Sequence, residues 1–148
     1  MTILPEVILR DYREGDYLEI SNLWEQIGLG GKYRGDTPEV IENTIRMGGR
    51  LIVMQENANG SIIGTSWLTL DGRRTYLHHF GIAHHWQRKG LSRPLLEHTL
   101  QIVREIGCQV KLEVHTSNPV AVELYKKYGF QRLGDYDVYI IREIGKTD

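Results

Sequence analysis

The stretch from Tyr76 to Ile106 holds residues of the kind that bind a phosphorylated ligand. It passes from an apolar, strand-like run into a basic turn and then into a helix-like run. Arg88 and Lys89 add positive charge where the first N–H groups of the helix lack acceptors, and Gly90 allows a ligand to approach closely. We therefore expect an anion pocket that suits a pyrophosphate. A plain loop before a capped helix is the alternative, since short basic turns are common.

A helix is predicted directly after this turn. Apolar residues recur at spacings of three and four, as on the buried side of an amphipathic helix. This apolar set is Leu91, Leu95, Leu96, Thr99, Ile102, Val103 and Ile106. Ser92 is expected to be the N-cap residue, which places Pro94 in the first turn, where its missing N–H costs little. The helix is expected to end near Gly107.

A second pattern is a helix predicted over Pro119 to Tyr128 and closed by Gly129-Phe130. Together, the turn and this helix resemble the two signatures of the GCN5-related N-acetyltransferase (GNAT) family. The first, Gln/Arg-x-x-Gly-x-Gly/Ala, is matched by Gln87 and Gly90, and imperfectly by Ser92. The second, Asn-x-x-Ala-x-x-Leu-Tyr-x-x-x-Gly-Phe, is matched at Asn118, Ala121, Leu124, Tyr125, Gly129 and Phe130.

The resemblance implies a cofactor and the place where it binds. Family members use acetyl-CoA, whose pantetheine arm pairs with the strand that is here Phe80 to Ala83, and whose pyrophosphate lies in the turn from Arg88 to Ser92. The implied contact residues are Phe80, Ile82, Ala83, Gln87, Arg88, Lys89, Gly90, Leu91, Ser92, Asn118 and Tyr125. Ser92 stands where the family prefers Gly or Ala. Its hydroxyl can donate to a phosphate, or it can compete by capping the helix, so binding is expected to survive, with a reduced affinity as the alternative.

Acetyl transfer to an amine needs a base, because an ordinary primary amine, with a pKa near ~10, is protonated at neutral pH. Glu113 matches the base of the ribosomal-protein N-terminal acetyltransferase branch of the family, although it can equally pair with Lys111 or His115 on a strand surface. His78 and His79 are rivals, since an imidazole is a competent base. Adjacent strand residues point to opposite faces, so only one histidine is expected to face the cleft. We rank Glu113 slightly ahead of either histidine.

A proton is also needed for the leaving thiolate. Tyr125 occupies the family's tyrosine position, and the resemblance implies that it is the general acid and that Asn118 hydrogen-bonds the cofactor. An aromatic core residue is the alternative interpretation of Tyr125. The four histidines between His78 and His85 suggest a metal site as an alternative. However, neither pair of histidines has the i, i+4 spacing of a helical metal site, and no Cys or Asp lies among them. No metal is therefore expected.

The elements around these residues predict one mixed α/β domain over residues 1–148. Strands are expected at Val7 to Tyr12, Leu51 to Gln55, Ser61 to Leu70, Thr75 to Ala83 and Gln109 to His115, with one or two closing strands in Gln131 to Arg142. Helices that open at Gly15-Asp16 and Thr37-Pro38 flank a glycine-rich loop, Gly28 to Gly35. This loop is expected to be mobile and to face the substrate, the alternative being a solvated connection that contacts no ligand.

The order of these elements predicts an antiparallel meander followed by a parallel strand pair that splays apart, with flanking helices. A strand, a helix and a strand in succession imply a parallel pair joined by a right-handed crossover. This is the fold that the GNAT resemblance implies.

Composition narrows the class of protein further. The 148 residues carry a formal net charge of −1, and 41% are hydrophobic, as in ordinary globular proteins. Without a basic surplus, neither nucleic acid nor an anionic membrane is expected as a partner. No signal-peptide pattern and no apolar run of about 20 residues is visible, so a cytoplasmic location is expected. The single cysteine, Cys108, is expected to pack near the core.

The expected function is transfer of an acetyl group from acetyl-CoA to a primary amine by direct attack in a ternary complex. The acceptor is expected to be a small-molecule or peptide amine that no motif identifies, and a homodimer is possible, as is common in the family. A non-catalytic acetyl-CoA-binding sensor or assembly module is the main alternative. A nucleotide-binding domain is less favoured, because no complete Gly-x-Gly-x-x-Gly or Gly-Lys-Ser/Thr motif is present.

Overall fold

The computed structural model describes residues 6–30 and 34–145 of the chain. The chain divides into two compact units, Met1–Glu113 and Val114–Asp148, and each is described by itself. The prediction of a single domain over residues 1–148 stays a prediction. Residues 31–33 of the predicted mobile loop lie outside the described residues.

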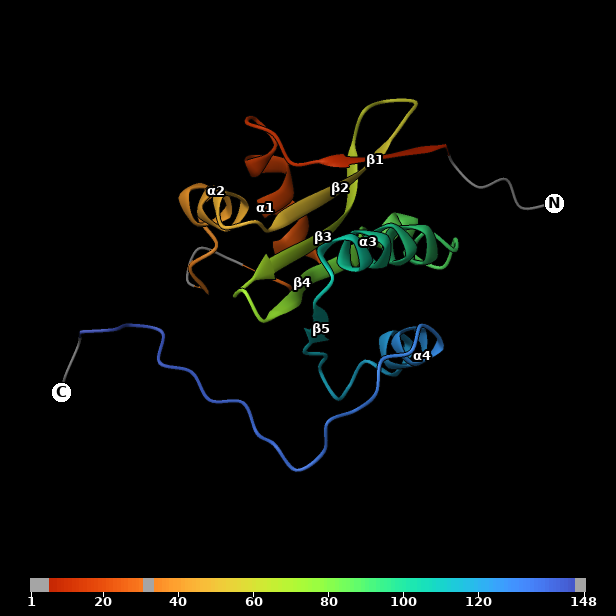
Figure 1. Ribbon diagram of the computed structural model, residues 1–148. Coiled ribbons are helices and arrows are strands. Elements are labelled where there is room, and N and C mark those ends of the chain that lie inside the picture. Colours follow the sequence, from red (N-terminus) through yellow and green to blue (C-terminus); the bar gives the residue numbers. More distant parts are fainter. Residues whose placement is uncertain (1–5, 31–33, 146–148) are drawn as a thin grey trace. The chain divides into compact units, whose positions relative to one another are not determined.

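The first unit is built on a five-stranded sheet with the order β1-β2-β3-β4-β5 (Figure 1). The strands are β1 (Val7–Asp11), β2 (Arg50–Glu56), β3 (Ile62–Leu70), β4 (Arg74–Ile82) and β5 (Gln109–Leu112). The first four pair antiparallel in sequence order, and β5 pairs parallel to β4. The predicted meander and the parallel pair are therefore confirmed, and the unit is a mixed α/β fold.

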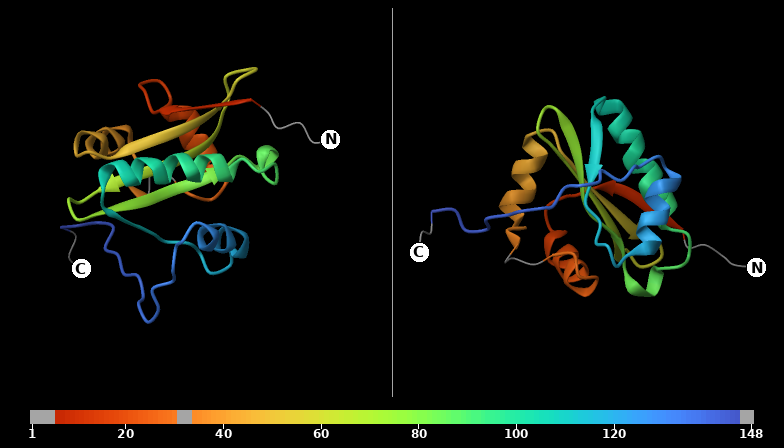
Figure 2. Two further views of the ribbon diagram at one scale, coloured as in Figure 1. Left: turned by 45° about the vertical axis from the view of Figure 1, so that its right-hand side comes forward. Right: turned by 90° about the horizontal axis from the view of Figure 1, so that it is seen from below.

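Helices cover both faces of this sheet (Figure 2). α1 (Tyr17–Gln26) and α2 (Pro38–Arg46) lie on one face, and α3 (Ser92–Ile106) lies on the other. On the first face the stacked rings of Trp24 and Trp67, 5.6 Å apart, form the centre of an apolar cluster. On the α3 face Leu95 and Leu96 are fully buried, which accounts for the apolar spacing in the sequence.

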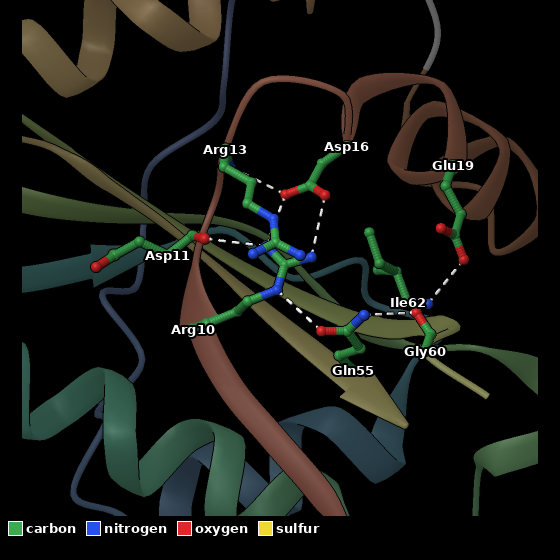
Figure 3. A network of polar contacts seen from close by, with 8 residues as sticks. All are labelled: Arg10, Asp11, Arg13, Asp16, Glu19, Gln55, Gly60 and Ile62. Carbon is green, nitrogen blue, oxygen red and sulfur yellow. Dashed lines mark hydrogen bonds and ion pairs between the residues drawn. The ribbon is translucent and has the colours of Figure 1, made fainter. Parts of the chain in front are cut away.

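A network of charged and polar groups fixes the start of α1 to the sheet (Figure 3). The Arg10 guanidinium donates to both carboxylate oxygens of Asp16, at 2.8 and 3.0 Å, and its Nε donates to Gln55 Oε1 at 3.0 Å. One turn further along, Glu19 accepts the backbone N–H of Ile62 at 2.7 Å. Side chains from β1, β2 and α1 thus hold the helix that carries Trp24 into the core.

The parallel pairing of β4 and β5 is short, and this opens the sheet. It runs from Arg74 opposite Gln109 to Leu77 opposite Leu112, whereas β4 continues to Ile82. The prediction that the fifth strand reaches His115 is wrong, because the alternation of side chains continues there while backbone pairing with β4 does not. Beyond Leu77, the edge of β4 that faces β5 is left without a strand partner among the described residues.

The second unit contains one described helix, α4 (Pro119–Lys127), at the predicted place. The prediction of closing strands in Gln131 to Arg142 is wrong, since residues 131–142 are described without helix or strand. Tyr136, Tyr139 and Ile141 of this segment are exposed, although their types favour strands. Side-chain pattern alone does not form a strand, which needs a neighbouring backbone to accept and donate its hydrogen bonds. None of the described helices is both long and apolar enough to cross a membrane.

Candidate active site

The basic turn predicted from the sequence joins β4 to α3 and leaves its backbone amides accessible. It follows a short 3-10 helix (His84–Trp86), and Gln87 to Gly90 are exposed. Arg88 and Gly90 both have positive φ angles, 62° and 77°. Within the described residues, no acceptor is recorded for the backbone N–H groups of residues 88–91. Successive amides without acceptors, next to cationic side chains, form a site suited to an anion.

The start of α3 differs from the prediction in one residue. Ser92 is the first residue of the helix, and Leu91, which is buried, takes the N-cap position without any side-chain cap. The predicted N-cap role of Ser92 is therefore wrong, since the cap position falls one residue earlier in the chain. It follows that the Ser92 hydroxyl does not compete as a cap for the helix amides.

The open edge of β4 leads directly to this turn. Ala83 N–H donates to the Ile63 carbonyl of β3 at 2.7 Å, so alternation along the strand directs the backbone groups of Ile82 toward the opposite, open edge. Gln87 Nε2 donates to the Ile82 carbonyl at 2.8 Å and thereby ties the turn to the strand. A ligand that pairs with the β4 backbone can therefore reach the amides of residues 88–91 without leaving the first unit.

A bulge in β4 reorients the two adjacent histidines. Trp67 of β3 lies opposite His78 and Thr65 lies opposite Gly81, so His79 and Phe80 together face one residue of β3. His79 has a φ of 46°, a left-handed backbone conformation that is uncommon outside glycine. The rings of His78 and His79 both contact Trp67, with centroids 5.9 and 5.4 Å away. The prediction that the two side chains point to opposite faces is wrong, because the bulge breaks the alternation.

His79 is held on three sides. Its Nε2 lies 2.7 Å from Asp36 Oδ2, and both side chains are 14% exposed. The Trp24 ring packs edge-on against the imidazole, with centroids 4.4 Å apart. Thr65 links the two residues, since its hydroxyl accepts from Trp24 Nε1 at 2.8 Å and donates to the His79 carbonyl at 2.7 Å. The imidazole position is thus determined by α1, by β3 and by the loop before α2.

The other two candidate bases lie where β4 and β5 part. His78 follows the last β4 residue paired with β5, and Glu113 follows the last residue of β5. His78 is exposed at the surface, and protein atoms around its ring partly desolvate it and lower its pKa. His79 beside it acts in the same direction, while Asp36 and Glu113 act in the opposite one. His78 Nε2 also lies 2.8 Å from the Thr69 hydroxyl. The structure therefore places Glu113, His78 and His79 near one another in the first unit.

Asn118 and Tyr125 both belong to the second unit. The Asn118 carboxamide oxygen accepts from the backbone N–H of Ala121 at 3.2 Å and caps α4, which leaves its amide N–H₂ for another partner. Tyr125 is 8% exposed and its ring packs edge-on against Phe130, with centroids 5.5 Å apart. Burial raises the pKa of Tyr125 to about 12, so its phenol keeps its proton at neutral pH and can donate it.

Asp36 contacts a candidate base and was not predicted from the sequence. It precedes Thr37, the N-cap residue of α2, and nothing in its sequence context distinguishes it from an ordinary loop aspartate. Its pairing with His79 is a contact over 43 positions, which only the tertiary structure shows. Over residues 6–30 and 34–145, no three His, Cys, Asp or Glu residues are grouped as a metal site.

Known proteins are similar to this chain in sequence and in fold. The profile of the Acetyltransferase (GNAT) family matches residues 17–130. N-alpha-acetyltransferase RimI of Mycobacterium tuberculosis is 35% identical over 81 residues, which cover 52% of this chain and 50% of that protein, so the match spans about half the length of this relative. A GNAT-family acetyltransferase from Staphylococcus aureus has a TM-score of 0.78 at 17% identity, over 86% of this chain and 85% of that one.

A GNAT-family acetyltransferase from Elizabethkingia anophelis, solved with acetyl-CoA bound, has a TM-score of 0.63 at 20% identity, over 84% of this chain and 76% of that one. At these identities the two solved structures show a shared fold. The family profile, by contrast, extends over most of the sequence and includes both motifs. The chain therefore belongs to the acetyltransferase (GNAT) family, a family of acyl-CoA-dependent acetyltransferases, as the resemblance of its two motifs predicted.

Proposed function

We propose that this chain transfers the acetyl group of acetyl-CoA to a primary amine by direct attack in a ternary complex. The observation that carries the proposal is the continuity between the open edge of β4 and the free amides of residues 88–91 at the start of α3. This arrangement fits a long cofactor with an amide-containing arm and a pyrophosphate. Membership of the GNAT family and the acetyl-CoA bound to the Elizabethkingia protein support the choice of cofactor.

The chemistry assigned to the residues follows from what amide formation requires. A protonated amine loses one proton to a base before its nitrogen attacks the thioester carbon. The C–N bond forms and the C–S bond breaks. Tyr125, protonated at neutral pH, is the proposed proton donor to the leaving sulfur, and the second proton released from the nitrogen restores the phenol. The base is one of three residues, Glu113, His78 or His79. The acceptor amine belongs to a peptide or to a small molecule.

Cofactor binding is tested by calorimetric titration of acetyl-CoA and CoA, with ATP and NAD as controls. In Gly90→Glu, a carboxylate stands among the amides that would hold the pyrophosphate, so we expect acetyl-CoA affinity to fall by at least ~100-fold. Gly72→Glu is the matched control. Gly72 also has a positive φ, 87° against 77°, and a Cβ at either position has no neighbour within 4 Å. Gly72 precedes β4 whereas Gly90 follows it, so Gly72→Glu should keep wild-type affinity.

Two outcomes would reject the cofactor assignment. One is wild-type acetyl-CoA affinity in Gly90→Glu, which would show that the amides of residues 88–91 do not hold the cofactor. The other is binding of ATP or NAD in place of acetyl-CoA, which would favour a nucleotide-binding domain.

Catalysis is tested separately by release of free CoA thiol in the presence of an amine panel. The panel contains a peptide with a free N-terminal alanine, an N-acetylated peptide with one lysine, and spermidine. Tyr125→Phe should lower kcat by about 10- to 100-fold while acetyl-CoA affinity stays unchanged. A wild-type protein that binds acetyl-CoA tightly and releases no thiol with any panel member would support the non-catalytic sensor instead.

A further inference from the structure

We propose that Asp36 and His79 form a catalytic dyad in which Asp36 fixes the imidazole tautomer and leaves Nδ1 of His79 to accept the proton of the acceptor amine. The inference rests on the proposed acetyl transfer. It selects His79 among the three candidate bases and assigns to Asp36 a positioning role. Two residues 43 positions apart in the sequence thereby act as one unit.

The tautomer follows from the hydrogen-bonding capacity of the two groups. An ionised carboxylate only accepts hydrogen bonds, so the 2.7 Å contact between Nε2 and Asp36 Oδ2 requires the hydrogen to lie on Nε2. In a neutral imidazole the other nitrogen, Nδ1, then carries the lone pair. Asp36 therefore also stabilises the imidazolium that forms when Nδ1 takes up a proton.

The described residues leave Nδ1 available for this task. Among them, His79 makes a side-chain hydrogen bond through Nε2, to Asp36, and makes none through Nδ1. On the other side of the ring, a Cβ added at Gly30 would lie 3.5 Å from Nε2, so the loop closes over the Asp36 side of the imidazole.

The backbone places the dyad beside the open edge of β4. His79 lies two residues past Leu77, where pairing with β5 ends, and three residues before Ile82, whose backbone faces the edge proposed for the cofactor arm. Its φ of 46° is a left-handed conformation that residues other than glycine rarely adopt. Such outliers cluster at functional sites, because the surrounding structure must stabilise them. Here the bulge brings the imidazole to the face that α1 and α2 cover.

The loop end that carries Asp36 is fixed independently of the dyad. Tyr17 of α1 donates its hydroxyl hydrogen to the Asp36 carbonyl at 2.7 Å. Tyr17→Phe therefore removes a contact that anchors the loop and leaves the chemistry of both dyad side chains unchanged. This variant separates an effect of the carboxylate on the imidazole from an effect of loop position.

A pH test must take account of the charged groups around His79. Among the described residues, the titratable groups near it are Asp36 from the loop, His78 from its own strand and Glu113 beyond His78, and Tyr17 of α1 contacts the Asp36 backbone. The elements α1 and β3 present Trp24 and Trp67, which do not titrate.

The tautomer is measured in the free protein by long-range ¹⁵N–¹H correlation spectra of the histidine rings, with His79 assigned by its absence in His79→Gln. We expect a protonated Nε2 and an unprotonated Nδ1 at mildly alkaline pH. Asp36→Asn should give a mixture of tautomers, because a carboxamide can donate to Nε2 as well as accept from it. A protonated Nδ1 in the wild-type protein would overturn the proposal, whether or not an acceptor amine has been found.

Kinetics with the best amine of the panel provide the second test. His79→Gln should lower kcat by ~100-fold or more, and Asp36→Asn by about 10- to 100-fold. At low pH kcat/KM should fall as the base becomes protonated, which forms the acid limb of the plot of kcat/KM against pH. In Asp36→Asn this limb should move to lower pH, since a neutral amide stabilises the imidazolium less than a carboxylate does. Tyr17→Phe should leave that limb in place, and so should Asp11→Asn, which changes an exposed aspartate paired with Arg50.

Three kinetic results would contradict the dyad. One is a Tyr17→Phe variant with the same loss of kcat and the same profile as Asp36→Asn, which would make Asp36 a loop anchor only. Another is a His79→Gln variant with wild-type kcat. The third is loss of the acid limb in Glu113→Gln together with its retention in His79→Gln. A wild-type protein without turnover counts against the proposed function, and the ring spectra then decide the dyad alone.

Discussion

Replacing Arg10 with alanine should destabilise the first unit far more than replacing Arg50, although each arginine pairs with an aspartate. The Arg10 and Asp16 side chains are 16% and 9% exposed, whereas those of Arg50 and Asp11 are 37% and 57% exposed. Arg10→Ala removes both bonds to the Asp16 carboxylate and the bond to Gln55, and it leaves Asp16 with the N–H of Arg13 at 2.9 Å. Loss of one partner of a buried ion pair costs about 3–5 kcal/mol.

Because water still reaches part of the Arg10 side chain, we expect the lower end of that range, a loss of about 3 kcal/mol in the free energy of unfolding. For a chain of this length, that loss corresponds to a fall in Tm of roughly 6–12 °C. The exposed Arg50 pair should contribute less than ~1 kcal/mol, so Arg50→Ala is the matched control. Urea unfolding followed by tryptophan fluorescence reports on the change, since Trp24 and Trp67 are buried in this unit.

The pH dependence gives the same prediction an independent check. Burial alone would raise the pKa of Asp16, but the hydrogen bonds from Arg10 and from the Arg13 N–H outweigh burial, and the pKa is lowered. The ionised Asp16 carboxylate therefore contributes its full stabilisation above the unfolded-state pKa of an aspartate, about 3.9. This contribution is lost as pH falls through the lower pKa that Asp16 has in the folded state. The stability difference between wild type and Asp16→Asn should narrow below pH ~4. Equal losses in Arg10→Ala and Arg50→Ala at neutral pH would refute the reasoning.

Further predictions concern packing in the first unit, with a control substitution at Gly134 in the second unit. A Cβ at Gly49 would lie 2.5 Å from a backbone oxygen of β3, so Gly49→Ala should cost about 2–3 kcal/mol in urea unfolding. Gly134→Ala, where the nearest atom is the end of a flexible side chain at 3.7 Å, should cost less than ~0.5 kcal/mol, and a similar loss in both would contradict the steric argument. Thr65→Val removes the acceptor of buried Trp24 Nε1 and should cost ~1–3 kcal/mol; unchanged stability would show that this hydrogen bond is dispensable.

The sequence determined the elements whose signals are local. The apolar spacing from Leu91 to Ile106 predicted α3, and Thr37-Pro38 predicted the start of α2, because helix periodicity and capping depend on residues within one or two turns. Turn residues around Gly60 and Gly72 separated β2, β3 and β4 at nearly the observed bounds. The two motifs also indicated the GNAT family, which the family profile confirms.

Tertiary structure decided where backbone pairing stops and which distant side chains meet. The ends of β5 and the absence of strands in residues 131–142 depend on a neighbouring backbone, which the alternation of side chains does not report. The bulge at His79 changes the face of one side chain, a one-residue event that periodicity cannot detect. Asp36 reaches His79 only because α1, α2 and the meander fold its loop onto β4. Residue types and spacing thus indicated the reaction class, while the arrangement of a candidate base required contacts between residues far apart in the chain.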